Sequence, residues 1–264
     1  MGKKAVFFDI DGTLFDLKYR VPKSAIEAIH KLRENGIYAF ISTGRSRAFI
    51  SEKDILNIGF DGVSAACGTY ITYQDKVILE KLLDKDDILK TLKVLDDNKV
   101  FAVLEGSEYL YFDREKYKDQ NRMGKVFEEQ FLDGKILPVT GNEENCIINK
   151  MTLHLNGDKD FDRVINMLGD TYDYVYHKPN YMELLPPGFN KGTGIKYVCD
   201  YLGIDLEDTY AFGDSSNDLD MFKTVKYSVC MGNGTDEAKK AAGYITDRLE
   251  NDGILKGLKY YDLI

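Results

Sequence analysis

The sequence predicts an α/β protein, in which a doubly wound parallel sheet carries an inserted α+β domain. Three observations lead to this prediction. Apolar runs at residues 5–8 and 37–42 flank a helical pattern, which makes a right-handed βαβ unit with parallel strands. The same rhythm returns after Lys191. The 84–186 segment between these two parts mixes helices and strands in another order, which indicates a separate layer.

The first strand, residues 5–8, ends in two carboxylates. Asp9 and Asp11 follow it directly, and Gly12 and Thr13 then turn the chain. Strand alternation is expected to place both acids on the same side. Two carboxylates this close repel each other, so the pair indicates a bound cation, a proton donor, or both. The alternative is an ordinary turn, because Asp and Gly are common turn formers.

The next elements repeat this arrangement. A helix is expected over residues 24–34, where apolar side chains recur at helical spacing. Thr43-Gly44-Arg45 directly follows the second strand, residues 37–42. This is the same position, after the end of a strand, that Asp9 has after the first strand. Residues 61–82 predict further short strands, with turns near Cys67-Gly68 and Gln74-Asp75.

The inserted segment predicts a mixed α+β domain. Its expected elements are a helix from 84 to about 98, a hairpin around 105–107, a charged helix over 114–131, and strands near 151–155, 172–177 and 182–185. The predicted boundaries give a core of residues 1–83 and 187–264 and an inserted cap domain of residues 84–186. Pro186-Pro187-Gly188 supplies linker chemistry at the second boundary.

The core resumes with Lys191, a helix over 192–202 and a strand over 209–212. Gly213-Asp214-Ser215-Ser216-Asn217-Asp218 follows that strand. Open parallel sheets bind ligands outside the carboxyl ends of their strands, where the strand order reverses. We therefore expect the acids after the first and last of these strands, together with Thr43, to meet at one edge.

Composition narrows the classes of partner and location. The 264 residues carry a net charge of -9 with a pI near 5.0, which argues against binding to nucleic acid or to an anionic membrane. No run of 18 apolar residues is present, so no spanning helix is expected. The four cysteines are scattered, which indicates free thiols and a cytoplasmic location. Small anionic substrates stay possible, and either a monomer or a homodimer is compatible with the chain.

Four motifs in order resemble those of the haloacid dehalogenase-like hydrolases. They are the DIDGTL after the first strand, the Thr of STGR after the second, a lone Lys after the insertion, and GDSSND after the late strand. The TGR form, the large α+β insertion between the second and third motifs, and the GDxxNDxxM ending are similar to the Cof-type phosphatases. The resemblance covers the whole chain and implies a Rossmann-like core with a cap that selects the substrate.

The resemblance implies a phosphoric monoester hydrolase that acts on small phosphorylated metabolites, with sugar phosphates as the first guess. Asp9 would attack phosphorus and form an aspartyl phosphate. Asp11 would protonate the leaving oxygen and then take a proton from water. Mg²⁺ would be held by the carboxylates of Asp9 and Asp214 and by the backbone carbonyl of Asp11.

Other residues would complete the phosphate site. Thr43 would donate its hydroxyl, Lys191 would neutralise charge, and Gly44 would allow close backbone approach. Arg45 would touch either the phosphate or the cap, with a structural ion pair as an equal alternative. Asn217 would contact the substrate or act through water, and helix capping is its alternative.

Two other functions stay open. A sugar phosphomutase would use the same aspartyl phosphate, and a non-catalytic sensor would bind a phosphorylated ligand with the same fold.

The loop at Cys67-Gly68 departs from the family, which often has Asn before this Gly, so a ligand contact there is in doubt. Six cap residues could touch an anionic or sugar-like substrate, although each residue type is more often found at the surface or in packing: Arg122, Lys125, His154, His177, Lys178 and Tyr181.

Overall fold

The computed structural model describes residues 2–15, 20–50, 53–113, 135–155, 158–177 and 180–264. It has two compact units. The first comprises Met1–Gly44, Glu52–Leu79 and Asn190–Ile264, and the second comprises Arg45–Ser51 and Glu80–Phe189. The helix expected over 114–131 and the candidates Arg122, Lys125 and Lys178 lie outside the described residues. The predicted domain limits of 84–186 stay a prediction.

The first unit is built on an eight-stranded sheet in the order β14-β13-β12-β1-β2-β3-β4-β5. Its strands are β1 Ala5–Phe8, β2 Tyr38–Ser42, β3 Gly62–Ala65, β4 Tyr70–Tyr73, β5 Lys76–Glu80, β12 Thr209–Gly213, β13 Tyr227–Cys230 and β14 Tyr244–Ile245. The strands from β14 to β3 pair in parallel, and β4 runs antiparallel to β3. This confirms the predicted parallel α/β sheet.

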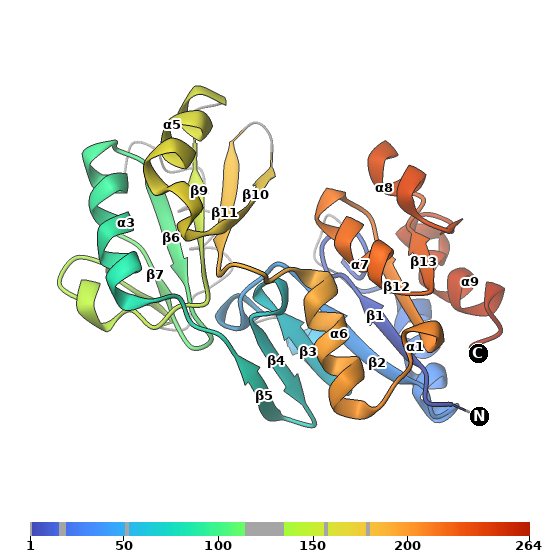
Figure 1. Ribbon diagram of the computed structural model, residues 1–264. Coiled ribbons are helices and arrows are strands. Elements are labelled where there is room, and N and C mark those ends of the chain that lie inside the picture. The colour runs from blue at the N-terminus through green and yellow to red at the C-terminus, as the bar shows by residue number, and fades with distance from the viewer. Residues whose placement is uncertain (1, 16–19, 51–52, 114–134, 156–157, 178–179) are drawn as a thin grey trace. The chain divides into compact units, whose positions relative to one another are not determined.

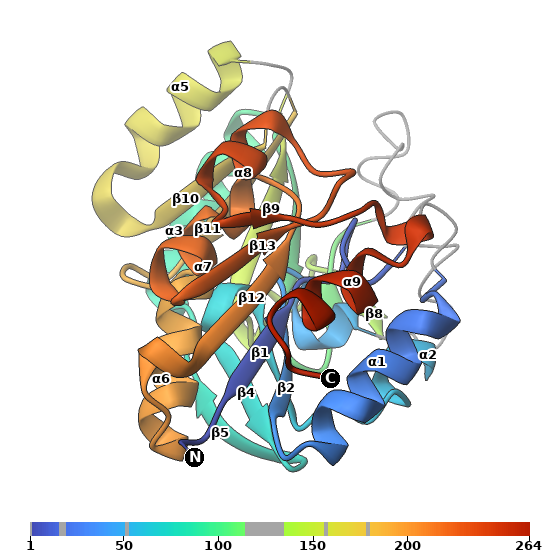
Figure 2. The ribbon, with the colours of Figure 1, turned by 90° about the vertical axis from the view of Figure 1, so that its right-hand side faces the viewer.

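Helices cover both faces of this sheet (Figure 2). They are α1 Lys23–Glu34, α2 Lys53–Leu56, α6 Lys191–Leu202, α7 Leu219–Thr224, α8 Asp236–Ala241 and α9 Gly253–Tyr260. Alternation along β1 divides the core, because Phe7 packs in the cluster that includes Ile195 of α6, while the ring of Phe8 stacks on Phe212. The position of Gly257 in α9 is close to the Phe212 ring. The two faces of the sheet are therefore both apolar, as a parallel sheet requires.

The strand order reverses at β1. The chain leaves β1 for β2 and β3 on one side, and it returns through β12 and β13 on the other. Phe8, the last residue of β1, lies opposite Ile41 of β2 and Phe212 of β12. The residues that follow these three strands therefore start from the same edge of the sheet, where doubly wound folds bind their ligands.

The second unit is an α+β layer. Its six-stranded sheet has the order β10-β11-β9-β6-β7-β8. The strands are β6 Phe101–Glu105, β7 Leu110–Tyr111, β8 Ile136–Leu137, β9 Lys150–His154, β10 Asp173–His177 and β11 Tyr181–Leu185, and the helices include α3 Lys85–Asp97 and α5 Asp158–Leu168. Asp84 caps α3 by accepting from the backbone of Asp86 and Asp87.

Side chains alternate between the two faces of this second sheet. Ala102, Leu104 and Met151 join the core under α3 and α5. Phe101 and Val103 point the other way, into a cluster with Ala48, which explains why residues 45–51 group with this unit. The segment Tyr109-Leu110-Tyr111-Phe112 contributes three buried residues to these clusters and is therefore part of the core of this unit.

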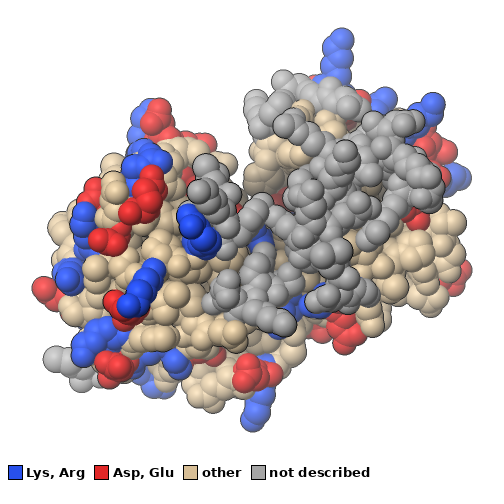
Figure 3. All heavy atoms as spheres, turned by 180° about the vertical axis from the view of Figure 1, so that it is seen from behind, with Lys and Arg blue, Asp and Glu red and all other residues tan. Residues whose placement is uncertain are grey.

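Charge on the described surface is mixed. On the face drawn in Figure 3, Lys and Arg side chains are interspersed with Asp and Glu. Among the described residues, no helix combines the length and the apolar character needed to cross a bilayer.

Candidate active site

Asp9 lies at the reversal point of the first sheet. Its backbone N–H donates to the Phe212 carbonyl of β12 at 3.0 Å, and its side chain is almost fully buried. The loop then turns tightly, because the backbone N–H groups of Leu14 and Phe15 both donate to the Ile10 carbonyl at 2.9 Å. The sequence DIDGT therefore forms a compact loop that holds Asp9 against the strand end.

Asp11 lies in this loop and is exposed, whereas Asp9 is buried. The strand alternation used to predict this does not apply, because β1 ends at Phe8 and neither acid belongs to the strand; a common side for the two acids stays a prediction. Asp11 is still near enough for its charge to raise the pKa of Asp9. Its exposure is compatible with exchanging protons with water.

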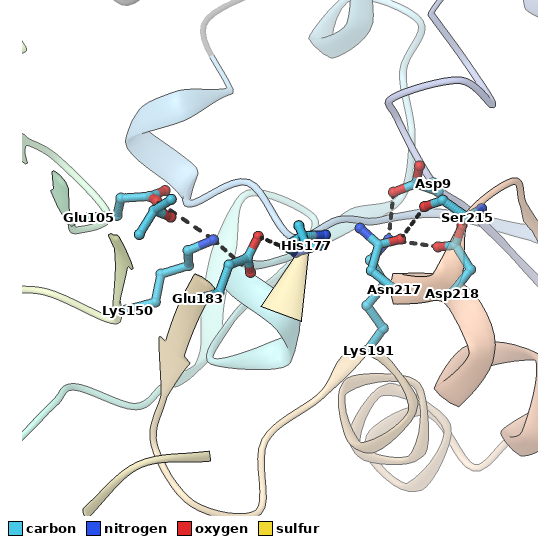
Figure 4. Close-up of polar contacts among 10 residues, drawn as sticks. Asp9, Glu105, Lys150, His177, Glu183, Lys191, Ser215, Asn217 and Asp218 are labelled. Carbon is cyan, nitrogen blue, oxygen red and sulfur yellow. Dashed lines mark hydrogen bonds and ion pairs between the residues drawn. The ribbon is translucent and has the colours of Figure 1, made fainter. Parts of the chain in front are cut away.

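Lys191 is the cation of the site. It is the first residue of α6, and Asn190 caps that helix by accepting from the Thr193 N–H while Thr193 returns a bond to the Asn190 N–H. The capped start aims the buried ammonium at the strand end, where Nζ lies 2.7 Å from Asp9 Oδ1 and 2.7 Å from Asp218 Oδ1 (Figure 4). Asn190 therefore orients Lys191 through the helix start that it caps.

Asp214 and Asp218 come from the loop after β12. Asp218 Oδ2 accepts from the backbone N–H groups of Asp214 at 2.8 Å and Ser215 at 3.0 Å. Its other oxygen contacts Lys191, so Asp218 connects the Asp214 loop to the lysine. Thr13 Oγ1 donates to Asp214 Oδ1 at 3.3 Å, which joins this loop to the one that carries Asp9.

Asn217 lies beside the same lysine. Its Oδ1 accepts from Ser215 Oγ at 2.8 Å and from Lys191 Nζ at 3.3 Å. The predicted contact with substrate stays a prediction. The observed bonds make Asn217 and Asp218 partners of Lys191, which the sequence analysis did not predict for either residue. The capping expected of this segment is present, but through Ser215 and Asp218.

Among the described residues of this cluster, the carboxylates of Asp9, Asp214 and Asp218 outnumber the ammonium of Lys191. Burial raises the pKa of Asp9 well above its ordinary value, against the attraction of Lys191, and Asp218, Asp214 and Asp11 raise it further. Burial and Asp218 raise the pKa of Asp214 to about 7. Burial alone would lower the pKa of Lys191, but its two carboxylate partners raise it, so the lysine stays charged.

This donor set fits a hard divalent cation. Oxygens of Asp9, Asp214 and Asp218 lie within 4.8 Å of one another, and the excess negative charge is what a cation would balance. Both oxygens of Asp218 already hold Lys191 or backbone N–H groups. We therefore favour Asp9 and Asp214 as the carboxylate ligands. The backbone carbonyl of Asp11 as a third ligand stays a prediction.

The predicted phosphate-binding residues begin at the end of β2. Thr43 is buried, with its N–H on the Ser64 carbonyl at 2.9 Å and its carbonyl accepting from the Cys67 N–H at 3.0 Å. Gly44 is the last residue of the first unit in this stretch, and Arg45 falls in the second, where its guanidinium lies 5.2 Å from the Phe49 ring. Their contacts with a phosphate stay predictions.

The second unit holds a buried ion cluster that the sequence reasoning missed. Lys150 Nζ lies 2.8 Å from Glu183 Oε2 and 3.6 Å from Glu105 Oε1, and His177 Nε2 lies 3.3 Å from Glu183 (Figure 4). His154 packs against the ring of Tyr181, with the ring centres 5.2 Å apart. Alternation of charged and apolar residues along β9 and β11 was the available signal.

Comparison with known proteins agrees with the motifs. The profile of the haloacid dehalogenase-like hydrolases matches residues 6–258. A phosphoglycolate phosphatase of Methanobrevibacter smithii is 27% identical over the whole of both chains. The 5-amino-6-(5-phospho-D-ribitylamino)uracil phosphatase YitU of Bacillus subtilis is 25% identical over 97% of this chain and 96% of its own. The sugar phosphatase BT4131, a solved subclass IIB structure, is 27% identical with a TM-score of 0.85 over 99% of this chain and 100% of its own.

Proposed function

This chain belongs to the haloacid dehalogenase-like hydrolase family and is a phosphatase of that family, and from this premise we propose that it hydrolyses small phosphorylated metabolites through an aspartyl phosphate on Asp9. The observation that carries the proposal is the buried contact of Asp9 with Lys191 at 2.7 Å, beside Asp214, at the reversal point of a parallel sheet. We propose sugar phosphates as the first substrates to test, because BT4131 is described as a sugar phosphatase.

The first half-reaction transfers the phosphoryl group to the enzyme. A carboxylate oxygen of Asp9 forms a bond to phosphorus as the ester P–O bond breaks. Asp11 gives a proton to the departing oxygen, which leaves as an alcohol. Lys191 holds Asp9 in place and offsets the negative charge that gathers at the transferring group.

The second half-reaction returns the enzyme to its starting state. Asp11, now a carboxylate, takes a proton from water, and the water oxygen forms a bond to phosphorus. The acyl P–O bond to Asp9 breaks and inorganic phosphate leaves. The exposure of Asp11 supports its proposed exchange of protons with the leaving alcohol and the incoming water.

Mg²⁺ would be held by the carboxylates of Asp9 and Asp214 and the backbone carbonyl of Asp11, and it would supply positive charge that reduces repulsion between the nucleophile and the phosphoryl oxygens. The chain's own part is to pre-arrange these oxygens. Asp218 and Asn217 fix Lys191 on one side, and the Thr13 hydroxyl fixes Asp214 on the other.

The test is phosphate release from a panel of phosphorylated metabolites, with Mg²⁺ and with chelator, for the wild-type protein and Asp9→Asn. The amide keeps the shape of the side chain and removes the nucleophile, so we expect a loss of more than about 1,000-fold in turnover. Asp220→Asn is the matched control, because Asp220 is about half exposed and its carboxylate pairs only loosely with Lys223 at 3.8 Å. It should keep wild-type activity.

Two outcomes would contradict the proposal. Turnover by Asp9→Asn close to wild type would remove Asp9 as the nucleophile. Interconversion of sugar phosphates without release of inorganic phosphate, followed by ³¹P magnetic resonance, would identify a phosphomutase instead.

A further inference from the structure

The loop after β13 contacts both loops of the candidate active site, although none of its residues belongs to the four motifs. Met231 N–H donates to the Gly213 carbonyl at 2.9 Å, and Thr235 N–H donates to the Asp214 carbonyl at 2.8 Å. A Cβ on Gly234 would lie 2.7 Å from that same Asp214 carbonyl oxygen, so only glycine permits this approach. The loop is therefore fixed to the backbone that carries Asp214.

Asn233 extends this loop to the turn that follows the nucleophile. Its Nδ2 donates to the Gly12 carbonyl at 2.7 Å, and its Oδ1 accepts from the Leu249 N–H at 3.0 Å. The orientation of the carboxamide follows from its partners, because a carbonyl can only accept and an N–H can only donate. Asp in this position would set an oxygen against the Gly12 carbonyl, and Gln would be one methylene too long.

Gly12 is the point where the two active-site loops meet. It lies between Asp11 and Thr13 and has a φ of 84°, and a Cβ there would lie 2.5 Å from Asp214 Oδ2. The carbonyl of Gly12 is one peptide away from the Asp11 carbonyl, and the side of Gly12 on which a Cβ would stand is packed against the Asp214 carboxylate. A clamp on Gly12 sets the spacing between these two groups.

We propose that Asn233 is a positioning residue, which clamps the Gly12 turn to the loop after β13 and so sets the spacing of Asp11 and Asp214. This inference rests on the proposed function for its effect on turnover. Its physical basis is that the ligand oxygens are useful only when they are held in place before the cation and substrate arrive. Asn233 would act through the backbone of Gly12, to which its side chain is bonded.

The test compares Asn233→Leu with Thr246→Val. Leucine has a similar volume to asparagine and loses both hydrogen bonds. Thr246→Val removes another side-chain bond from the same region, that of Thr246 Oγ1 to the Gly253 carbonyl at 2.7 Å, which does not reach Gly12. Three measurements are made: Mg²⁺ affinity by calorimetry, hydrogen exchange of residues 10–15 in metal-free protein, and kcat and KM.

For Asn233→Leu we expect Mg²⁺ affinity to fall by about 10- to 100-fold, with a similar fall in kcat and little change in KM. Exchange at Leu14 and Phe15 should become faster than in Thr246→Val. If both variants bind Mg²⁺ and exchange these amides alike, Asn233 is merely structural and the proposal is overturned.

A second variant and a separate readout distinguish failure of this inference from misfolding and from failure of the proposed function. Asn233→Asp keeps the acceptor for Leu249 and loses the donor to Gly12, so it tests the clamp even if the leucine variant does not fold; unchanged exchange at residues 10–15 in this variant would refute the clamp. If the wild-type protein hydrolyses no phosphate ester, the proposed function fails, while hydrogen exchange and Mg²⁺ affinity still decide the role of Asn233.

Discussion

Asp214→Asn is expected to make the metal-free protein more stable at neutral pH while it abolishes activity. Burial and the nearby Asp218 carboxylate raise the pKa of Asp214 to about 7 from an ordinary value of 3.8, and the attraction of Lys191 and the Thr13 hydroxyl only partly opposes them. Ionisation of Asp214 is therefore less favourable in the folded protein than in the unfolded chain, and it lowers the free energy of unfolding. The amide removes this cost and still accepts from Thr13.

The sign and size of this change in stability follow from the linkage between protonation and folding. A carboxyl group whose folded pKa lies above its unfolded pKa stabilises the fold fully below the unfolded value, near 3.8, and this stability is lost as pH rises through about 7. The interval of about 3 pH units, at about 1.4 kcal/mol each, sets an upper limit of about 4 kcal/mol. Neighbouring carboxylates share the proton, so the effect should be somewhat smaller than this limit. We expect the free energy of unfolding of Asp214→Asn, relative to that of wild type, to rise by about 2–4 kcal/mol from pH 4 to pH 8.

The assay is native-state hydrogen exchange of the β1 and β12 amides, which reports the stability of the unit that holds the site. Wild type, Asp214→Asn and the exposed control Asp220→Asn are compared at pH 4 and pH 8, with chelator and with Mg²⁺. Mg²⁺ should stabilise wild type at pH 8 much more than at pH 4, and it should stabilise Asp214→Asn little at either pH.

Two results would refute this reasoning. A stability difference between Asp214→Asn and wild type that does not change with pH would show that Asp214 carries no unfavourable charge. Equal stabilisation of both proteins by Mg²⁺ would show that Asp214 does not bind the ion.

Two further substitutions test the contacts of the buried cations. Asp218→Asn should lower kcat by about 10- to 100-fold with little change in KM, because Lys191 loses one of its two charged partners, and steady-state kinetics against Asp220→Asn checks this; an unchanged kcat would show that Asp9 alone positions the lysine. Burial by itself would raise the pKa of Glu183, but Lys150 and His177 together lower it below its ordinary value. Lys150→Met should therefore destabilise the second unit by about 3–5 kcal/mol at neutral pH. In wild type this pair contributes above the ordinary carboxyl pKa and is lost as pH falls, so the loss, measured by exchange of the β9 and β11 amides, should shrink on acidification; a constant loss would point to packing instead.

The general architecture was predictable because it depends on local patterns. Apolar runs of four or five residues, helical stripes between them and Asp or Thr directly after them identified the parallel sheet and the strand ends with Asp9, Thr43 and Asp214. The helix after the insertion was predicted to begin at Gly192. It begins one residue earlier, at Lys191, where the Asn190 cap and its bond to Thr193 mark the start. Such signals act within a few residues, so a sequence displays them.

The partners within the site were less predictable. Strand alternation does not apply to Asp9 and Asp11, because the strand ends at Phe8. Asp218 had a clear capping signal, but its bond to Lys191 spans 27 positions in the chain, and no local pattern reports it. Asn233 reaches Gly12 across 221 positions, and its Gly-Asn-Gly context alone predicts only a turn.

The sequence by itself determined which chemical groups stand at strand ends and helix starts: an acid pair, a second acid, a threonine and a lysine. Only the tertiary structure decided which carboxylate the lysine holds, which acid is buried, and which turn Asn233 clamps. The reason is physical. Pairing and pKa depend on distances of a few ångströms and on burial, and both arise when strands distant in sequence are brought to one edge of the sheet.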